Sequence, residues 1–160
     1  IGGGTRDTGK SAMDWILEAW NEHGHDDPAR HGEMMKLWVR SEVLRLNNLR
    51  AEETRTTGTP GPEGSIGKVI SAEFNKDAFA FALGLTGMAG TLFDGGYDLD
   101  QTRPVLDYDT LAEYFLRVRA NSIEGGTTEV MRNILGERVL GLPGDVRVDK
   151  DVAWKDVARN

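Results

Sequence analysis

The sequence has no cysteine among its 160 residues and only three histidines. Without cysteine, disulfide scaffolds, thiolate nucleophiles and cysteine-rich zinc sites are excluded. His23, His25 and His31 lie at and after the end of a predicted helix, and no carboxylate is placed to complete a metal site with them. A histidine at a helix end more often interacts with the helix dipole, so no metal ion is expected.

Long hydrophobic runs and an excess of positive charge are also missing. The longest apolar run covers residues 78–85, less than half of the roughly 20 residues that a membrane-spanning helix needs. The chain carries 26 acidic and 19 basic residues, and its formal charge of -7 repels nucleic-acid phosphates at long range. Neither a membrane span nor a nucleic-acid partner is therefore expected.

The composition that remains is typical of a folded soluble domain. Hydrophobic residues make up 39% and charged residues 28%, and the length suits about one domain. The chain starts at Ile1 without a methionine and without the pattern of a signal peptide. We interpret it as a processed protein or as a fragment of a longer one.

Apolar side chains recur at helical spacing in five stretches of the chain. These predicted helices cover residues 10–23, 28–56, 66–85 and 106–120, and a last one is opened by Thr127 or Thr128 and runs to about residue 139. Asp27 followed by Pro28 is a typical helix start. Because no stretch alternates with a period of two, the sequence predicts an all-α fold. We expect an antiparallel four-helix-type bundle over residues 1–144 and a charged tail at 145–160.

Two sets of side chains on these helices have ordinary structural interpretations. The charged residues of the third predicted helix are expected to form a solvated face; they are Lys68, Glu73, Lys76 and Asp77. The tryptophans and phenylalanines stand at helical spacing, so we expect them in the core or in contact with another subunit rather than around a ligand.

The segment SIEGGTTEVMR, residues 122–132, combines groups that can perform chemistry. A carboxylate (Glu124), two glycines and two threonines precede a predicted helix N-terminus, where backbone N–H groups and the helix dipole attract anions. Glycines let a bound group approach the backbone, and a desolvated carboxylate can act as a general base. The same residues also fit a plain N-cap by Thr127 or Thr128, with Glu129 in the first turn.

Residues 126–132, GTTEVMR, resemble the Gly-Thr-x-Glu/Gln-Ile-x-Arg signature near the C-terminus of acyl-CoA dehydrogenases. NILGERVLGL at 133–142 continues the resemblance. Further back, SIGK at 65–68 and LGLTG at 83–87 stand where the family has a long helix and a Gln-x-x-Gly-Gly-x-Gly turn. The resemblance covers most of the chain and is most specific in its last third.

The resemblance implies the C-terminal helical bundle of a three-domain enzyme that binds FAD and desaturates an acyl-CoA thioester. In this family a glutamate removes the α-proton, a hydride passes from the β-carbon to the flavin, and an electron-transferring flavoprotein takes the electrons. The bundle drives assembly, so we expect a homo-oligomer (dimer or tetramer) or a hetero-oligomer with a related subunit. A bacterial cytoplasmic location is expected rather than the mitochondrial matrix. Because flavin and substrate lie between domains, this chain alone is expected to be inactive.

Matched to the family's motif, Thr127, Thr128 and Glu129 are expected to contact FAD, and Gly126 is expected to lie beside the substrate thioester. The catalytic glutamate of many members stands two places before the threonine, where this chain has Gly125. Three hypotheses for the base follow. It is Glu124, one place earlier on an altered loop; it comes from a helix upstream of this chain; or the subunit has lost it and works beside a catalytic partner.

The glycine turn agrees with the family only in part. Gly84 and Gly87 match it and are further expected cofactor contacts, whereas Phe81 stands at the family's glutamine and Leu85 at its second glycine. A non-catalytic bundle that serves only in assembly is the competing hypothesis. It gives no reason for two glycines and two threonines directly before a helix.

Overall fold

The computed structural model describes residues 9–24, 27–58, 61–92, 110–144 and 152–157. Every regular element within these residues is a helix, and none of them forms a strand. The α-helices are α1 (Ala12–His23), α2 (Pro28–Thr57), α3 (Glu63–Leu85), α4 (Leu111–Arg117) and α5 (Thr128–Arg138). The 3-10 helices are η1 (Gly87–Thr91), η2 (Val118–Ser122) and η3 (Trp154–Asp156).

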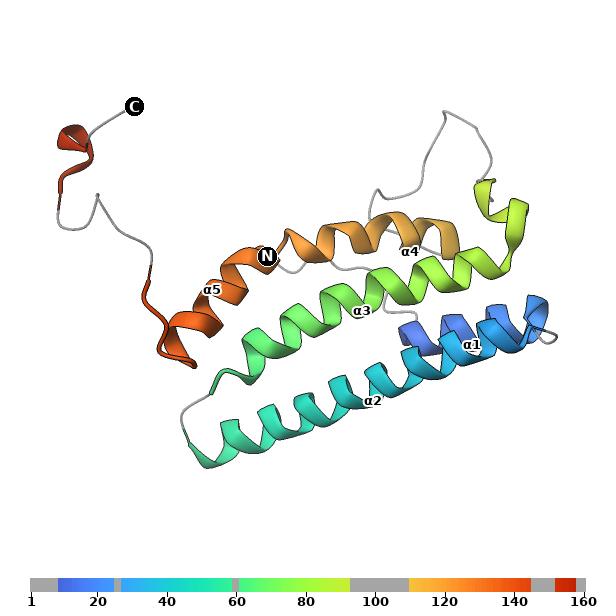
Figure 1. Cartoon of the computed structure of the whole chain (residues 1–160), viewed down its shortest axis with the longest axis horizontal. Coiled ribbons are helices and arrows are strands. Elements are labelled where there is room, and N and C mark those ends of the chain that lie inside the picture. The colour runs from blue at the N-terminus through green and yellow to red at the C-terminus, as the bar shows by residue number, and fades with distance from the viewer. Residues whose placement is uncertain (1–8, 25–26, 59–60, 93–109, 145–151, 158–160) are drawn as a thin grey trace.

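The α-helices form an antiparallel bundle in which α3 is the central element (Figure 1). Helices α1, α2 and α3 run in alternating directions, and α4, η2 and α5 follow one another along the remaining side of α3. Helix α3 contacts α1, α2, α4 and α5. The fourth helix position of the bundle is therefore filled by three short elements, α4, η2 and α5, instead of one long helix. The predicted all-α, four-helix-type fold is confirmed.

Three helix starts are set by side chains beside them in the sequence. The Asp27 carboxylate accepts hydrogen bonds from the backbone N–H groups of Ala29 (2.9 Å) and Arg30 (3.1 Å), and a proline follows it, as predicted. Ser11 and Thr110 each form a capping box with the acidic residue three places on. Each cap satisfies N–H groups that have no partner within the first helical turn.

Three helices start at other residues than predicted, and one of them is α1, which begins at Ala12 instead of residue 10. Helix α3 begins at Glu63 instead of residue 66. Helix α4 begins at Leu111 instead of residue 106, because Thr110 supplies its cap, and after Arg117 the chain continues as the 3-10 helix η2. The predicted boundary between bundle and tail at residue 145 lies outside the described residues.

The core lies where α1, α2 and α3 meet. Its buried members are Ile16 and Ala19 from α1, Met34 and Leu37 from α2, and Phe74, Ala78, Ala82 and Leu85 from α3. The alanines of α3 let its neighbours approach closely, and the larger Ile16 and Phe74 fill the space between the helices. Burying one such large apolar side chain stabilises the fold by about 1.5–3 kcal/mol.

The predicted solvated face of α3 is confirmed for Asp77, which is exposed, whereas the other three charged residues are partly buried. Lys68 is partly buried, and its Nζ donates a hydrogen bond to the backbone oxygen of Asn121 at 2.6 Å. Asp77 forms an ion pair with Arg40 of α2 at 2.7 Å. The three partly buried side chains depart from the prediction because α3 is contacted by four other helices, so they contact residues of those helices as well as water.

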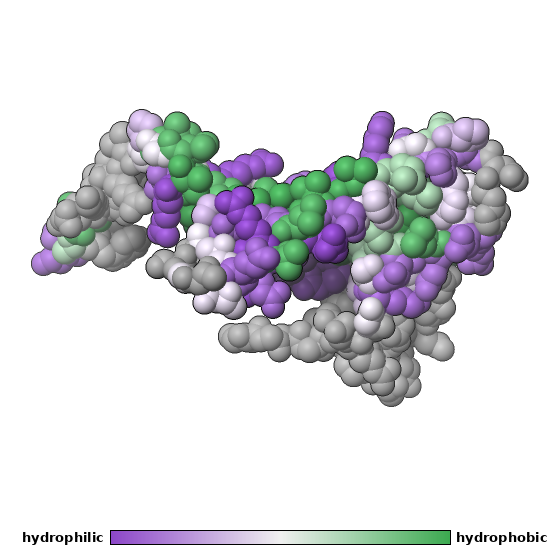
Figure 2. Space-filling model, turned by 90° about the horizontal axis from the view of Figure 1, so that it is seen from below, coloured by the Kyte–Doolittle hydropathy of each residue, from purple (hydrophilic) through white to green (hydrophobic). Residues whose placement is uncertain are grey.

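Helix α2 leaves an apolar stripe uncovered, which we call the α2 ridge. Its members are 42% to 54% exposed and stand on one face of the helix: Met35, Trp38, Val39, Val43, Leu46 and Leu49. Figure 2 shows a hydrophobic band along the face seen from below, the side on which α2 lies in Figure 1. None of the described helices is both long enough and apolar enough to cross a membrane.

Candidate functional site

The segment that the sequence singles out is a loop, residues 121–127, between η2 and α5. The backbone N–H groups of Ile123 and Glu124 donate to the oxygen of Ala120 at 2.8 and 2.9 Å, which continues the turn of η2 into the loop. Lys68 of α3 bonds the backbone oxygen of Asn121. The loop is therefore tied both to the preceding helix and to the central helix of the bundle.

Two glycines turn the chain from this loop into α5. Gly125 has a φ of +64° and Gly126 a φ of +98°, a backbone region that glycine adopts without the steric cost that other residues bear. A Cβ added to Gly125 would meet no atom within 4 Å, whereas one added to Gly126 would overlap the methyl carbon of Met131. A bound group can therefore approach the backbone at Gly125, and Gly126 is packed against the chain itself.

The N-terminus of α5 is capped by its own residues. Thr127 is the N-cap, and its Oγ1 accepts a hydrogen bond from the backbone N–H of Val130 at 3.2 Å, so the predicted N-cap is confirmed. The backbone N–H of Glu129 itself, together with the Thr127 hydroxyl, holds the pKa of the Glu129 carboxyl below its ordinary value. Thr127 is partly exposed and Glu129 fully exposed, so both present polar groups at the surface.

Thr128 differs from its neighbours because its side chain turns inward. It is only 4% exposed, and its Oγ1 is buried without a hydrogen-bond partner within the described part of the chain. Asn121 Oδ1 and Ser122 Oγ are buried and unpartnered in the same sense. Buried polar atoms are normally satisfied by protein or by ordered water. The predicted cofactor contact of Thr128 stays a prediction, on the buried side of α5.

Both oxygens of the Glu124 carboxylate are held by side chains. Arg117 Nη2, at the end of α4, donates to Oε2 at 2.8 Å, and Asn121 Nδ2 donates to Oε1 at 3.0 Å. The hydrogen bond from Arg117 is the main reason that the pKa of Glu124 lies below its ordinary value; the nearby charges of Arg117 and Lys68 and the bond from Asn121 act in the same direction, against partial desolvation. We call the arrangement of Arg117, Asn121 and Glu124 the loop clasp.

The glycines expected to contact the cofactor lie far from this loop. Gly84 and Gly87 line an open cavity of about 470 Å³ together with His23, Asp27 and Arg30. Gly84 stands sixteen positions after Lys68, the residue of α3 that bonds the loop. At about 1.5 Å per residue this is roughly 24 Å along the helix. The predicted site residues thus form two groups at different positions along α3.

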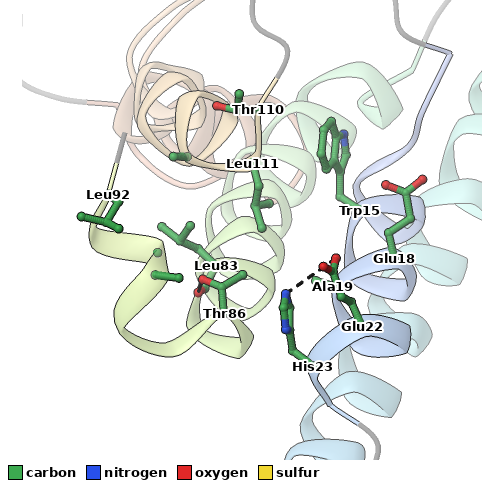
Figure 3. Close-up of a pocket in the computed structure, with 13 residues that line it drawn as sticks. Trp15, Glu18, Ala19, Glu22, His23, Leu83, Thr86, Leu92, Thr110 and Leu111 are labelled. Carbon is green, nitrogen blue, oxygen red and sulfur yellow. Dashed lines mark hydrogen bonds and ion pairs between the residues drawn. The ribbon is translucent and has the colours of Figure 1, made fainter. Parts of the chain in front are cut away.

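Near the same end of α3 lies a larger and more apolar cavity, of about 510 Å³ (Figure 3). Trp15 of α1 borders it, facing Leu83 of α3 and Leu111 of α4 across the cavity. His23 lies on its rim and pairs with Glu22, with 3.7 Å between Nε2 and Oε2. No group of three histidine or acidic side chains among the described residues could hold a metal ion, and His25 lies outside them.

Four residues of these sites were not predicted from the sequence: Lys68, Arg117 and Asn121 beside the loop, and Arg30 beside the glycines. A weak signal existed for Arg117, which stands seven residues before Glu124 at a helix end. For Lys68 there was none, because its partner lies 53 residues further along the chain.

Comparison with known proteins identifies relatives of this chain. Residues 12–140 match the family model described as "Acyl-CoA dehydrogenase, C-terminal domain". The acyl-CoA dehydrogenase IpdE1 of Mycolicibacterium smegmatis is 28% identical over 122 residues, which cover 76% of this chain and 28% of that protein. Its namesake from Mycobacterium tuberculosis is also 28% identical, over 76% of this chain and 29% of the relative. The chain thus spans less than a third of the curated relatives it matches.

A solved structure has a similar arrangement of helices. It is the "Tcur3481-Tcur3483 steroid ACAD", which superposes with a TM-score of 0.67 over 83% of this chain and 34% of that one. The sequence identity is 17%, so this likeness concerns the fold. The helical fold and the family model over residues 12–140 agree, and we conclude that the chain belongs to the acyl-CoA dehydrogenase family, of which it contains the C-terminal helical domain.

Proposed function

We propose that this chain is the C-terminal domain of an FAD-dependent acyl-CoA dehydrogenase that introduces an α,β double bond into an acyl-CoA thioester. The observation that carries the proposal is the 121–127 loop. It presents an approachable backbone at Gly125 and polar groups at Thr127 and Glu129, within the stretch that matches the family. In this proposal Gly126 lies beside the thioester of the substrate.

The residues present fit a flavin cofactor at both groups of predicted contacts. At the loop, the Thr127 hydroxyl and the Glu129 carboxylate are suited to the N–H and carbonyl groups of a flavin ring, and Thr128 supports them from inside. At the glycines, a Cβ on Gly84 would meet only Arg30 Nη1, at 3.6 Å, so an anionic group could approach both the backbone and a positive charge. When bound, FAD would accept the hydride that leaves the β-carbon.

Two features support assembly with a second subunit. One group of predicted cofactor contacts lies at the loop, which is bonded by Lys68, and the other lies at Gly84, about 24 Å from Lys68 along α3, so one compact site in this chain does not unite them. The α2 ridge exposes a continuous apolar face of the kind that marks a protein interface. We propose that the ridge packs against another copy or a related subunit; the name of the similar solved structure also joins two gene products.

The proton that leaves the α-carbon needs a general base. One candidate is Glu124, the only carboxylate of the 121–127 loop, although its lowered pKa makes it a weak proton acceptor near neutral pH. A carboxylate upstream of this chain is the alternative. We further propose that an electron-transferring flavoprotein reoxidises the flavin and that the enzyme works in the bacterial cytoplasm, since the curated relatives come from mycobacteria.

The proposal is tested with the complete protein that carries this chain. We expect the purified protein to show flavin absorbance and to reduce ferricenium with at least one member of a panel of straight, branched and steroid acyl-CoAs. The 160 residues alone should do neither. A colourless complete protein that stays inactive after reconstitution with FAD would favour the second candidate, a bundle that serves only in assembly, which the exposed α2 ridge also suits.

A further inference from the structure

The loop clasp joins three parts of the chain through one carboxylate. Arg117 ends α4, Asn121 belongs to η2, and Glu124 stands directly before the two glycines that turn the chain into α5. Lys68 adds a bond from α3 to the same loop. The side chain of Arg117 is 26% exposed and that of Glu124 is 46% exposed. The pair therefore lies at the surface of this domain.

This geometry is poorly suited to proton abstraction from a thioester. A general base works best when its pKa lies near the operating pH, and desolvation is what raises the pKa of a carboxylate toward that range. Glu124 is half exposed, and each of its oxygens already accepts a hydrogen bond from a neighbouring side chain. The ion pair with Arg117 favours the ionised carboxylate and therefore weakens it as a proton acceptor.

We propose that Glu124 is a positioning residue, which with Arg117 and Asn121 holds the Gly125–Gly126 turn and the start of α5 in place, and that the base lies outside this loop. The inference rests on the proposed desaturase function, because only then does the loop lie beside flavin and thioester. In this proposal Arg117 is as necessary as Glu124 for holding the turn, because the carboxylate needs the arginine as its partner.

The decisive experiment exchanges the two charges in the complete protein. The single variants Glu124→Arg and Arg117→Glu each place two like charges together, so both should lower turnover. The double variant restores an ion pair without restoring a carboxylate at position 124. If Glu124 positions the loop, the double variant should recover most of the lost turnover and of the lost affinity for acyl-CoA, read as KM. A base at position 124 would leave the double variant as inactive as the worse single variant.

A milder substitution gives an independent measurement. Glu124→Gln keeps one of the two acceptor oxygens, so either Arg117 or Asn121 can still donate to it, and removes the charge. We expect kcat/KM to change by about fivefold or less, as for the loss of one exposed ion pair. Removal of a general base costs about 100- to 10,000-fold and abolishes the acid limb of the pH profile. The matched control is Glu73→Gln, which breaks the similarly exposed Glu73–Lys76 pair on α3, away from the loop. A loss of 100-fold or more in Glu124→Gln, with normal flavin content and melting temperature, would overturn the proposal.

Hydrogen exchange separates a failure of the clasp from a failure of the proposed function. If the wild-type protein has neither flavin nor dehydrogenase activity, the function is wrong, and the exchange of amides 125–130 still tests the clasp. Glu124→Ala should speed that exchange, the charge-exchanged double variant should slow it again, and Glu73→Gln should leave it unchanged. Equal exchange in Glu124→Ala and the wild type would show that the clasp does not hold the loop.

Discussion

The two longest helices of the bundle, α2 and α3, use their apolar side chains in different ways. Helix α3 contributes four residues to the core and is contacted by α1, α2, α4 and α5. Helix α2 contributes Met34 and Leu37 to the same core and leaves the α2 ridge exposed on another face. The start of α2 is capped by Asp27, whereas α3 begins after Pro62 without a side-chain cap.

The apolar faces of α3 and α2 therefore serve different purposes, one inside the bundle and one at its surface. A helix covered by its neighbours gains its stability from packing and can begin without a cap. A helix with an apolar stripe on a second face has one stripe for its own bundle and one for a partner, because large exposed apolar patches are uncommon on monomers. We therefore assign folding of the domain mainly to α3; assembly through α2 is the proposal made for the α2 ridge.

The largest expected effect comes from the core face of α3. Phe74 is 4% exposed, so Phe74→Ala should lower the free energy of unfolding by about 3–5 kcal/mol, measured by urea denaturation. Leu116→Ala on α4 removes a side chain that is 64% exposed and should change the free energy of unfolding by less than about 0.5 kcal/mol. Similar losses in both variants would remove the basis for treating α3 as the stabilising helix.

The next effect concerns the α2 ridge. Leu46→Glu places a charge in the proposed interface and should weaken association by about 3 kcal/mol, the scale of an unpaired buried charge. Light scattering during size-exclusion chromatography should show smaller particles with unchanged helical circular dichroism. Asn21→Glu, an exposed position on α1, is the control and should leave the mass unchanged. An intact assembly in Leu46→Glu would contradict the role of the ridge.

A smaller effect is expected at the start of α2. Asp27→Ala removes the bonds to the N–H groups of Ala29 and Arg30 and should cost about 1 kcal/mol of unfolding free energy. Asp27→Asn keeps a hydrogen-bond acceptor at the N-cap and should lower the unfolding free energy by only a fraction of the loss in Asp27→Ala. If the two variants are equally unstable, the charge of Asp27 matters and the cap does not.

The smallest effect is a dependence of stability on pH at the loop. The pKa of Glu124 is lower in the folded chain than its ordinary value of 4.5, so its stabilising contribution is present above that value and is lost as the pH falls through the folded pKa. The melting temperature of the wild type should therefore decline more steeply below pH 4.5 than that of Glu124→Gln. Added salt should narrow the difference, because the pair is partly exposed. Parallel curves would show that the ion pair with Arg117 adds nothing to stability.

Features that depend on neighbouring residues could be predicted from the sequence. The cap at Asp27 and the N-cap at Thr127 involve N–H groups two or three residues away, so their pattern is visible in the chain. The start of α4 was placed too early because apolar spacing extends to residue 106, while the capping box of Thr110 and Glu113 sets the boundary.

Features that depend on residues distant in the sequence could not be predicted in this way. Lys68 has the spacing of a solvated residue on an amphipathic helix, yet it bonds Asn121 because α4 and η2 pack on that side of α3. The pairing of Glu124 with Arg117 likewise requires the turn of η2 between them. The local sequence does not show which of several nearby basic side chains forms the ion pair with the Glu124 carboxylate.

The helices, most of their ends and the family could be predicted from the chain, because hydrophobic periodicity, caps and motifs act over a few residues. Which faces of the helices are covered depended on how the helices pack. This packing made α3 central, left the α2 ridge exposed, held Gly84 and Gly87 away from the 121–127 loop and tied Glu124 to Arg117. The physical reason is that packing and ion pairing depend on distances in space, which are set only when all the helices have come together.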